Sequence, residues 1–150
     1  MSLFRWQFVV SLGAFLAIWL LCQSAVWLHG YSLLMAPFGA TLVLIFATPD
    51  SPLAQPRNVI GGHLLAATIA LALVHNFGDG AAVTAAAVGL SILLMFRTHT
   101  VHPPAGATAL VVMMTKPGWL FLLTPVAAGA VGLVLLAKCY HRYCAQPLRS

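Results

Sequence analysis

The chain has 150 residues, of which 61% are hydrophobic and only 6% are charged. Soluble globular domains carry roughly 25% charged residues, so the composition excludes a soluble domain and indicates a polytopic membrane protein. Seven basic residues stand against two acidic ones. They lie in short connections and near the chain ends, without interleaved aromatics, so positive-inside topology explains them better than nucleic-acid binding does.

Apolar segments follow one another along the chain, at residues 8–28, 33–48, 59–74, 81–96, 104–115 and 119–138. The first is longer than the roughly 7–15-residue core of a cleaved signal peptide, so we expect a retained spanning helix. The second and fifth are too short to cross about 30 Å of hydrocarbon as plain helices rising 1.5 Å per residue. The pattern predicts an all-α membrane protein with six membrane segments, of which the second and fifth are short or broken half-helices.

The two short segments also match each other. Pro37-Phe-Gly-Ala-Thr41 recurs as Pro104-Ala-Gly-Ala-Thr108, an offset of 67 residues (104 − 37). The same offset places Thr48 on Thr115 and Gly62 on Gly129. We interpret this as a duplication within one transmembrane domain covering residues 1–150. Repeat 1 spans about residues 8–75 and repeat 2 about residues 81–140.

The basic residues indicate how the segments cross. If all six cross, the cytoplasmic side holds six of them, against Lys116 alone outside: Arg5, Arg57, Arg97, Lys138, Arg142 and Arg149. If the two short segments are re-entrant, the division is four against three. The positive-inside rule favours six crossings, which makes the repeats inverted and both termini cytoplasmic. We expect this protein in a bacterial inner membrane.

Each Pro-x-Gly-Ala-Thr motif predicts a helix N-terminus, since proline suits the first helical position. Free N–H groups and the positive helix end suit an anion there, and inverted repeats bring two such ends to the midplane. The predicted substrate-binding residues are Pro37, Gly39, Ala40, Thr41, His102, Pro104, Gly106, Ala107 and Thr108. The alternative is that these small residues only allow close helix packing.

Further residues are candidates for the pathway or for proton transfer, namely His63, Asn58, Arg97 and His99. An ionisable side chain inside a spanning helix is a functional hypothesis by default, and only histidine titrates near neutral pH. The alternative for His63 is a neutral side chain bonded to a neighbouring helix. Arg97 is either a cytoplasmic anchor or a charge that attracts anions. His99 and His102 have no third partner at a metal-binding spacing, so we expect neither metal nor cofactor.

Two stretches resemble the HPP family of integral membrane proteins, which is named for its His-Pro-Pro motif. They are Val101-His102-Pro103-Pro104-Ala105-Gly106-Ala107-Thr108 and Ser51-Pro-Leu-Ala-Gln-Pro-Arg-Asn-Val-Ile-Gly-Gly-His63. Family members are usually described as four-helix proteins, and hydropathy alone would miss two short broken helices. Relatives in plant plastids and cyanobacteria have been linked to nitrite transport. The resemblance therefore implies nitrite, or a similar small anion, as the leading substrate.

Together these observations predict membrane transport of a small monovalent anion, by a channel or a carrier, with nitrite as the first candidate. No carboxylate pair, activated nucleophile or phosphate loop is recognisable, so an enzyme is not expected. The expected partners are the lipid bilayer and further copies of this chain, because a bundle this small encloses little space. Nucleic acid is not expected. The alternatives are a non-transporting membrane subunit or sensor, and a proton-coupled transporter of another small solute.

Overall fold

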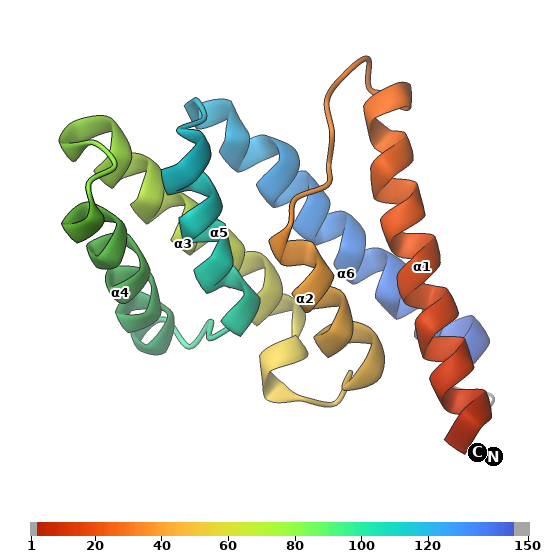
Figure 1. The fold of residues 1–150 in the computed structure, drawn as a ribbon. Helices are drawn as coiled ribbons and strands as arrows, with labels where there is room; N and C mark the ends of the chain where they lie inside the picture. Colours follow the sequence, from red (N-terminus) through yellow and green to blue (C-terminus); the bar gives the residue numbers. More distant parts are fainter. Residues whose placement is uncertain (1–2, 146–150) are drawn as a thin grey trace.

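The computed structural model describes residues 3–145, which form helices joined by short connections (Figure 1). This confirms the predicted all-α architecture with six α-helices. In chain order the elements are α1 (Leu3–Trp27), α2 (Pro37–Leu42), the π turn η1 (Val43–Ala47), the 3-10 turn η2 (Pro52–Ala54), α3 (Pro56–Phe77), α4 (Ala81–Arg97), α5 (Pro103–Thr115), the 3-10 turn η3 (Trp119–Leu122), the π turn η4 (Leu123–Ala127), α6 (Ala128–Tyr140) and the π turn η5 (His141–Ala145).

Prolines begin three of these helices. Pro37, Pro56 and Pro103 stand in the first turns of α2, α3 and α5, where a missing N–H costs no intrahelical hydrogen bond. The α5 helix begins one residue before the predicted Pro104, and His102 precedes it in extended conformation, with φ −138° and ψ 101°. It ends at Lys116, whose left-handed φ of 46° stops the helix.

Three helical segments are long and apolar enough to cross a membrane: Phe4–Trp27, Pro56–Phe77 and Trp119–Cys144. The second and fifth segments are short, as predicted, at Pro37–Ala47 and Pro103–Thr115. The α4 helix is also short. Its 17 residues reach only about 26 Å at 1.5 Å per residue, which the sequence pattern did not separate from the long segments.

The apolar segment at residues 119–138 lies within the candidate span Trp119–Cys144 and is interrupted near its start. Thr124, the residue before Pro125, has extended backbone angles, φ −139° and ψ 121°. The segment therefore consists of η3, η4 and α6. The η3 turn begins 67 residues after η2 (119 − 52), so a 3-10 turn precedes the third helix at equivalent positions in the two repeats.

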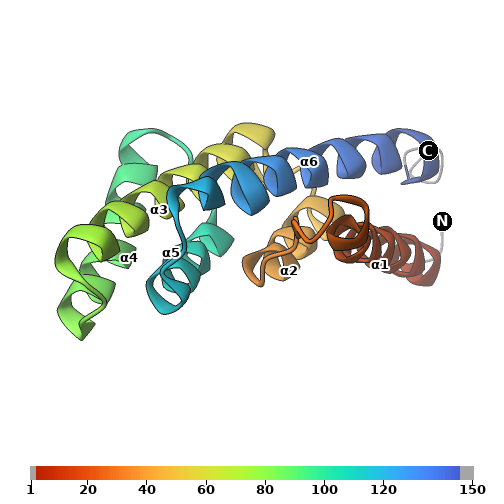
Figure 2. The same cartoon turned by 90° about the horizontal axis from the view of Figure 1, so that it is seen from above.

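The chain direction alternates between successive helices. Figure 1 shows α1, α3 and α5 running towards one end of the molecule, and α2, α4 and α6 running towards the other. Three helices in each half with reversed directions make the two repeats inverted. Seen from above, α3 and α6 lie along one side, with α1, α2 and α5 on the other (Figure 2).

Most of the basic side chains gather at one end of the molecule. Arg57, at the start of α3, donates a hydrogen bond of 2.7 Å to the carbonyl of Thr98, just after α4. The ring of Trp6 near the start of α1 lies 6.3 Å from that of His141 at the end of α6. The five Lys or Arg residues of the described chain found at this end are Arg5, Arg57, Arg97, Lys138 and Arg142. Arg149 lies outside the described residues, and the side of the membrane that this end faces stays a prediction.

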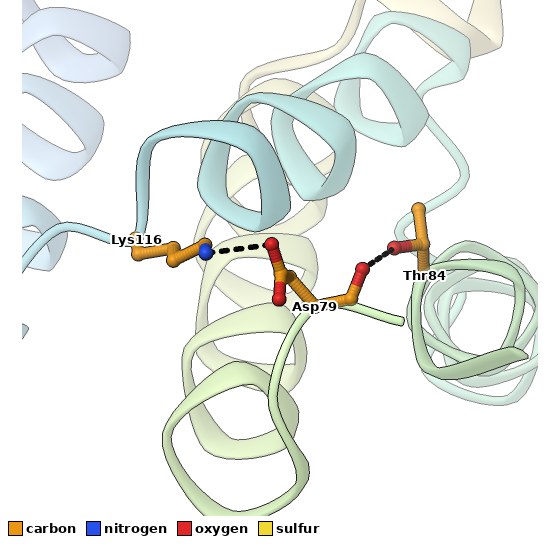
Figure 3. Close-up of polar contacts among 3 residues, drawn as sticks. All are labelled: Asp79, Thr84 and Lys116. Atoms are coloured by element: carbon orange, nitrogen blue, oxygen red, sulfur yellow. Dashed lines mark hydrogen bonds and ion pairs between the residues drawn. The ribbon is translucent and has the colours of Figure 1, made fainter. Parts of the chain in front are cut away.

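The opposite end carries one ion pair. The ammonium of Lys116, after α5, lies 2.6 Å from the carboxylate of Asp79 in the α3–α4 connection (Figure 3). The hydroxyl of Thr84 donates to the backbone carbonyl of Asp79 at 3.3 Å. These contacts tie the α3–α4 connection to the α5–α6 connection.

Each third helix crosses the second segment of the other repeat. A Cβ atom on Gly62 of α3 would lie 3.0 Å from the carbonyl oxygen of Thr100 and 3.4 Å from the Cβ of Ala105. Only glycine lets α3 approach the extended chain before α5 this closely. We call this contact, with the side chains around it, the polar crossing.

The second such contact has the same geometry. A Cβ atom on Gly129 of α6 would lie 2.6 Å from the carbonyl oxygen of Leu33 and would overlap the ring of Phe38. All three positions are 67 residues from their counterparts in the polar crossing (129 − 62, 100 − 33 and 105 − 38). We call this contact the apolar crossing. The two crossings lock the repeats together by exchanged contacts.

Candidate functional site

Three polar side chains from three parts of the chain meet in the polar crossing. The hydroxyl oxygen of Thr41 in α2 lies 2.9 Å from Nε2 of His63 in α3 and 3.0 Å from Nε2 of His102, the residue before α5. All three residues have no accessible surface. Buried polar groups must be paired to avoid a desolvation cost of about 1–3 kcal/mol each, so this contact also fixes α2 against α3.

Two further hydrogen bonds extend this group. Nδ1 of His102 lies 2.9 Å from the carbonyl oxygen of Leu53 in η2, and Nδ1 of His63 lies 2.7 Å from the hydroxyl of Thr108 in α5. Thr108 is also fully buried. The result is a chain of four hydrogen bonds in the order Leu53–His102–Thr41–His63–Thr108, and the hydroxyl of Thr41 also lies 3.3 Å from the carbonyl oxygen of Pro37.

One backbone carbonyl fixes the direction of every bond in this chain when both imidazoles are neutral. The Leu53 carbonyl can only accept, so Nδ1 of His102 carries hydrogen and its Nε2 is bare. For every imidazole nitrogen to be paired, the Thr41 hydroxyl donates to His102 and accepts from Nε2–H of His63. Nδ1 of His63 is then bare and accepts from the hydroxyl of Thr108.

Neighbouring contacts hold this chain in place. The side-chain amide of Asn58 donates to the carbonyl of Val101 at 2.8 Å, which fastens the extended segment before α5 to α3. The rings of Phe38 and His63 pack edge to face, with their centroids 5.2 Å apart. The ring of Phe38 also packs on Gly129 in the apolar crossing, so Phe38 links the two crossings.

Within each Pro-x-Gly-Ala-Thr motif, the structure separates the predicted binding residues into two faces. The proline and the threonine stand four residues apart and are buried on one helical face, at Pro37, Thr41, Pro104 and Thr108. The glycine and alanine between them lie on the other side of each helix. Gly39 and Gly106 have open space where a Cβ would be, and Ala40 and Ala107 are exposed. No bound anion tests either face, and their role in binding stays a prediction.

The other predicted pathway residues divide as well. His63 and Asn58 belong to the polar crossing. Arg97, at the end of α4, and His99, just after it, are exposed and lie outside the polar crossing. Sequence reasoning missed Leu53, because a backbone carbonyl leaves no trace in residue type. It also missed Phe38, whose ring touches both crossings.

A polar cleft of about 590 Å³ opens at the basic end of the molecule. Its ionisable lining comes from the chain after α2 and from the end of α6, with Asp50, Lys138, His141 and Arg142. It is also lined by Ala54 and Gln55, which directly follow Leu53, so the η2 turn lies between the cleft and His102.

Residues 3–145 contain no group of three His, Cys, Asp or Glu side chains placed to hold a metal ion. Cys22, Cys139 and Cys144 are exposed free thiols. The reactive groups of the polar crossing are therefore hydroxyl and imidazole groups, which can donate or accept hydrogen bonds and exchange protons.

Comparison with known proteins gives the family. The description "HPP, transmembrane region" matches residues 2–148. Two proteins of Dictyostelium discoideum, each named only as a transmembrane protein, are similar to this chain. One is 37% identical over 146 residues, which are 92% of this chain and 51% of the relative, and the other is 39% identical over 118 residues, which are 73% and 38%. The chain thus spans about half or less of the length of these relatives, and no solved structure matches it.

The matched region includes both stretches on which the resemblance was based, and the structure supplies the apolar helices that a multi-pass membrane protein needs. The chain belongs to the HPP family of membrane proteins.

Proposed function

We propose that this protein transports a small monovalent anion, with nitrite as the first candidate, past the polar crossing. The observation that carries the proposal is that the threonines of both Pro-x-Gly-Ala-Thr motifs converge on one buried histidine. Thr41 and Thr108 come from opposite repeats and bond to the two nitrogens of His63. Hydroxyl and N–H groups beside two helix N-termini suit an anion that gives up its water.

The charge distribution supports an anion rather than a cation. The chain has two carboxylates, Asp50 and Asp79, and neither lies within a helix. Lys138 and Arg142 line the polar cleft at the basic end, where they would raise the local concentration of anions. A cation pathway would need oxygen ligands with negative charge, which the helices do not provide.

Transport requires the polar crossing to open, because its four side chains are buried and bonded to one another. The α3, α4 and α5 helices pack on one another, so a movement of α2 against this group would separate Thr41 from His63 and His102 and expose them. An alternating movement of this kind fits a carrier. We further propose the inner membrane of a bacterium, a homo-oligomer and the absence of enzymatic activity.

The test is nitrite flux into liposomes that contain the purified protein. Gly106→Val fills the open space beside the first turn of α5, from which an anion would reach the free N–H groups of that turn, and Gly89→Val fills equally open space in α4. Both variants should fold, since neither Cβ meets another atom within 4 Å. We expect flux in the parent and in Gly89→Val, and its loss in Gly106→Val. Absence of flux for nitrite, nitrate and formate in the parent would contradict the proposal.

One observation favours a second candidate, a membrane subunit or sensor that serves another protein region. The matched segment makes up only 51% and 38% of the two relatives, so those proteins have further regions beside it. This candidate predicts no flux of any small anion. It also predicts that Gly106→Val and Gly89→Val behave alike in liposomes.

A further inference from the structure

We propose that the polar crossing binds one proton, on His102, and that this proton crosses the membrane together with the anion. The inference rests on the proposed function for its second half only. The proton site itself follows from the hydrogen-bond geometry of four side chains and two backbone carbonyls.

When both imidazoles are neutral, the hydroxyl of Thr41 has a second acceptor within hydrogen-bonding distance. The hydroxyl of Thr41 lies 3.3 Å from the carbonyl oxygen of Pro37, one turn earlier in α2, as well as 3.0 Å from His102. In the neutral chain the hydroxyl hydrogen points to Nε2 of His102, and the Pro37 carbonyl keeps only its ordinary helical role. Rotation about one side-chain bond moves that hydrogen to Pro37 and leaves the heavy atoms in place.

A proton added to Nε2 of His102 therefore finds an acceptor. His102 then donates from both nitrogens, to Leu53 and to Thr41, and Thr41 donates to Pro37. The hydroxyl oxygen of Thr41 has two lone pairs, so it also keeps the bond from Nε2–H of His63. Every donor still has an acceptor. Protonation adds one N–H bond, breaks only the bond that held the proton to water, and consumes nothing else.

The same accounting favours His102 over His63 as the proton site. A proton on Nδ1 of His63 would donate to Thr108, whose hydroxyl hydrogen would then need a new acceptor. Among the described contacts of Thr108 there is none. A second proton is also opposed by repulsion, since the two imidazole rings lie only 5.0 Å apart. The polar crossing thus has room for one positive charge.

Few other charged groups face this site. The α3 helix contributes Arg57, which is bonded to Thr98, and the connection before it contributes Asp50, three residues from Leu53. The α2 and α5 helices contain no ionisable side chain. A proton on His102 is therefore balanced best by an incoming anion. One proton with one monovalent anion gives transport without net charge movement.

The first experiment examines the proton site without any transport. Protein with ¹⁵N-labelled histidine is reconstituted in lipid bilayers and titrated by solid-state NMR, beside a His102→Asn variant. Asparagine can still donate to the Leu53 carbonyl but cannot bind a proton, and His75→Asn at the other end of α3 is the matched control. We expect an imidazolium signal whose two nitrogens both assign to His102, and which is absent in His102→Asn but present in His75→Asn. If His102 stays neutral at every pH at which the protein is folded, the proton site is overturned.

The second experiment examines coupling in liposomes at neutral pH, with protein-free liposomes as background. Nitrite uptake and internal pH are recorded while potassium and valinomycin set the membrane potential. We expect about one proton to enter with each nitrite ion. Uptake should be driven by a pH gradient and should not depend on the membrane potential. The His102→Asn variant should lose this uptake. Flux that follows the potential without proton movement overturns the coupling and leaves anion transport in place. No flux in the parent overturns the transport proposal, and the coupling with it, even where His102 titrates.

Discussion

The two crossings share a backbone plan and differ in their side chains. Sixty-seven residues separate His63 from Ala130 and His102 from Met35 (130 − 63 and 102 − 35). Ala130 and Met35 are buried, as the histidines are, but offer no hydrogen bond. The apolar crossing packs without a hydrogen-bonded chain. A crossing of this backbone geometry can therefore form without histidines, and we propose that those of the polar crossing serve transport.

The glycines, in contrast, are common to both crossings. Gly62 and Gly129 each let a helix approach a carbonyl oxygen of the other repeat to within contact distance. Small residues are the usual means of close helix approach in membranes, where no hydrophobic force draws helices together. The comparison separates what the fold requires at both sites from what the proposed activity requires at one.

The largest effect should come from filling the apolar crossing. Gly129→Ala places a methyl group 2.6 Å from the carbonyl of Leu33 and against the ring of Phe38, and the backbone cannot yield. We expect the free energy of unfolding to fall by about 3 kcal/mol in mixed detergent micelles. Gly132→Ala, one turn further along α6, meets no atom within 4 Å and should be neutral or slightly stabilising. Equal stabilities for the two variants would refute this role of Gly129.

Filling the polar crossing should cost somewhat less. The methyl group of Gly62→Ala would lie 2.9 Å from the Cβ of His102 and 3.0 Å from the carbonyl of Thr100. The extended segment before α5 can shift a few tenths of an ångström, so we expect a loss of about 2 kcal/mol. The same shift lengthens the bond from His102 to Thr41 and should move the ¹⁵N signals of His102. Unchanged signals with unchanged stability would mean that the contact is looser than described.

Removing hydroxyl groups sharpens the contrast within the polar crossing. Thr41→Val keeps the side-chain volume but leaves two imidazole nitrogens without a partner, so we expect a loss of about 2 kcal/mol. Thr108→Val leaves one such nitrogen and should cost about 1 kcal/mol. Thr68→Val is the control, because Thr68 is exposed and bonds only within α3. Unfolding in mixed micelles measures the loss of stability in all three variants. We expect the loss to be largest for Thr41→Val, smaller for Thr108→Val and smallest for Thr68→Val, and a different order would contradict this account.

The smallest effect belongs to the ion pair outside both crossings. A hydrogen bond from Lys116 and its positive charge lower the pKa of Asp79 in the folded protein. The resulting stabilisation is present above the unfolded pKa of the carboxyl and disappears as the pH falls through the lowered folded value. Because the pair is exposed, Lys116→Met should not change unfolding measurably.

The same variant should nevertheless raise the pKa of Asp79. Carboxyl-carbon NMR can follow it directly, since Asp50 is the other carboxylate side chain of the sequence and serves as the internal control. An identical titration of Asp79 in the parent and in Lys116→Met would show that the ion pair does not form in solution.

Much of the fold could be predicted from the sequence, because hydropathy and proline placement act locally. Pro37 and Pro103 begin the short helices, and the 67-residue offset aligned Gly62 with Gly129 before any contact was known. The break at Thr124 was missed, although the proline after it carries the signal. The apolar pattern of residues 119–138 outweighed that single residue.

The candidate site was predictable only in part. Proline and threonine at a spacing of four residues predict a shared helical face, and His63 stood out as an ionisable residue in an apolar run. The pairing of His63 with His102 depends on how α2, α3 and α5 meet, which no local pattern encodes. The carbonyl of Leu53, which sets every bond direction, is invisible to residue-type reasoning.

The most direct test of the central claim is nitrite flux in two matched variants, one in each crossing. Thr41→Val removes the hydroxyl that joins His63 to His102, and Met35→Leu conserves volume at the position equivalent to His102. We predict that Thr41→Val lowers nitrite uptake into liposomes roughly tenfold, the equivalent of about 1.4 kcal/mol, while Met35→Leu stays close to the parent. Equal losses in both variants, or full uptake in Thr41→Val, would contradict the claim that the polar crossing is the site of passage.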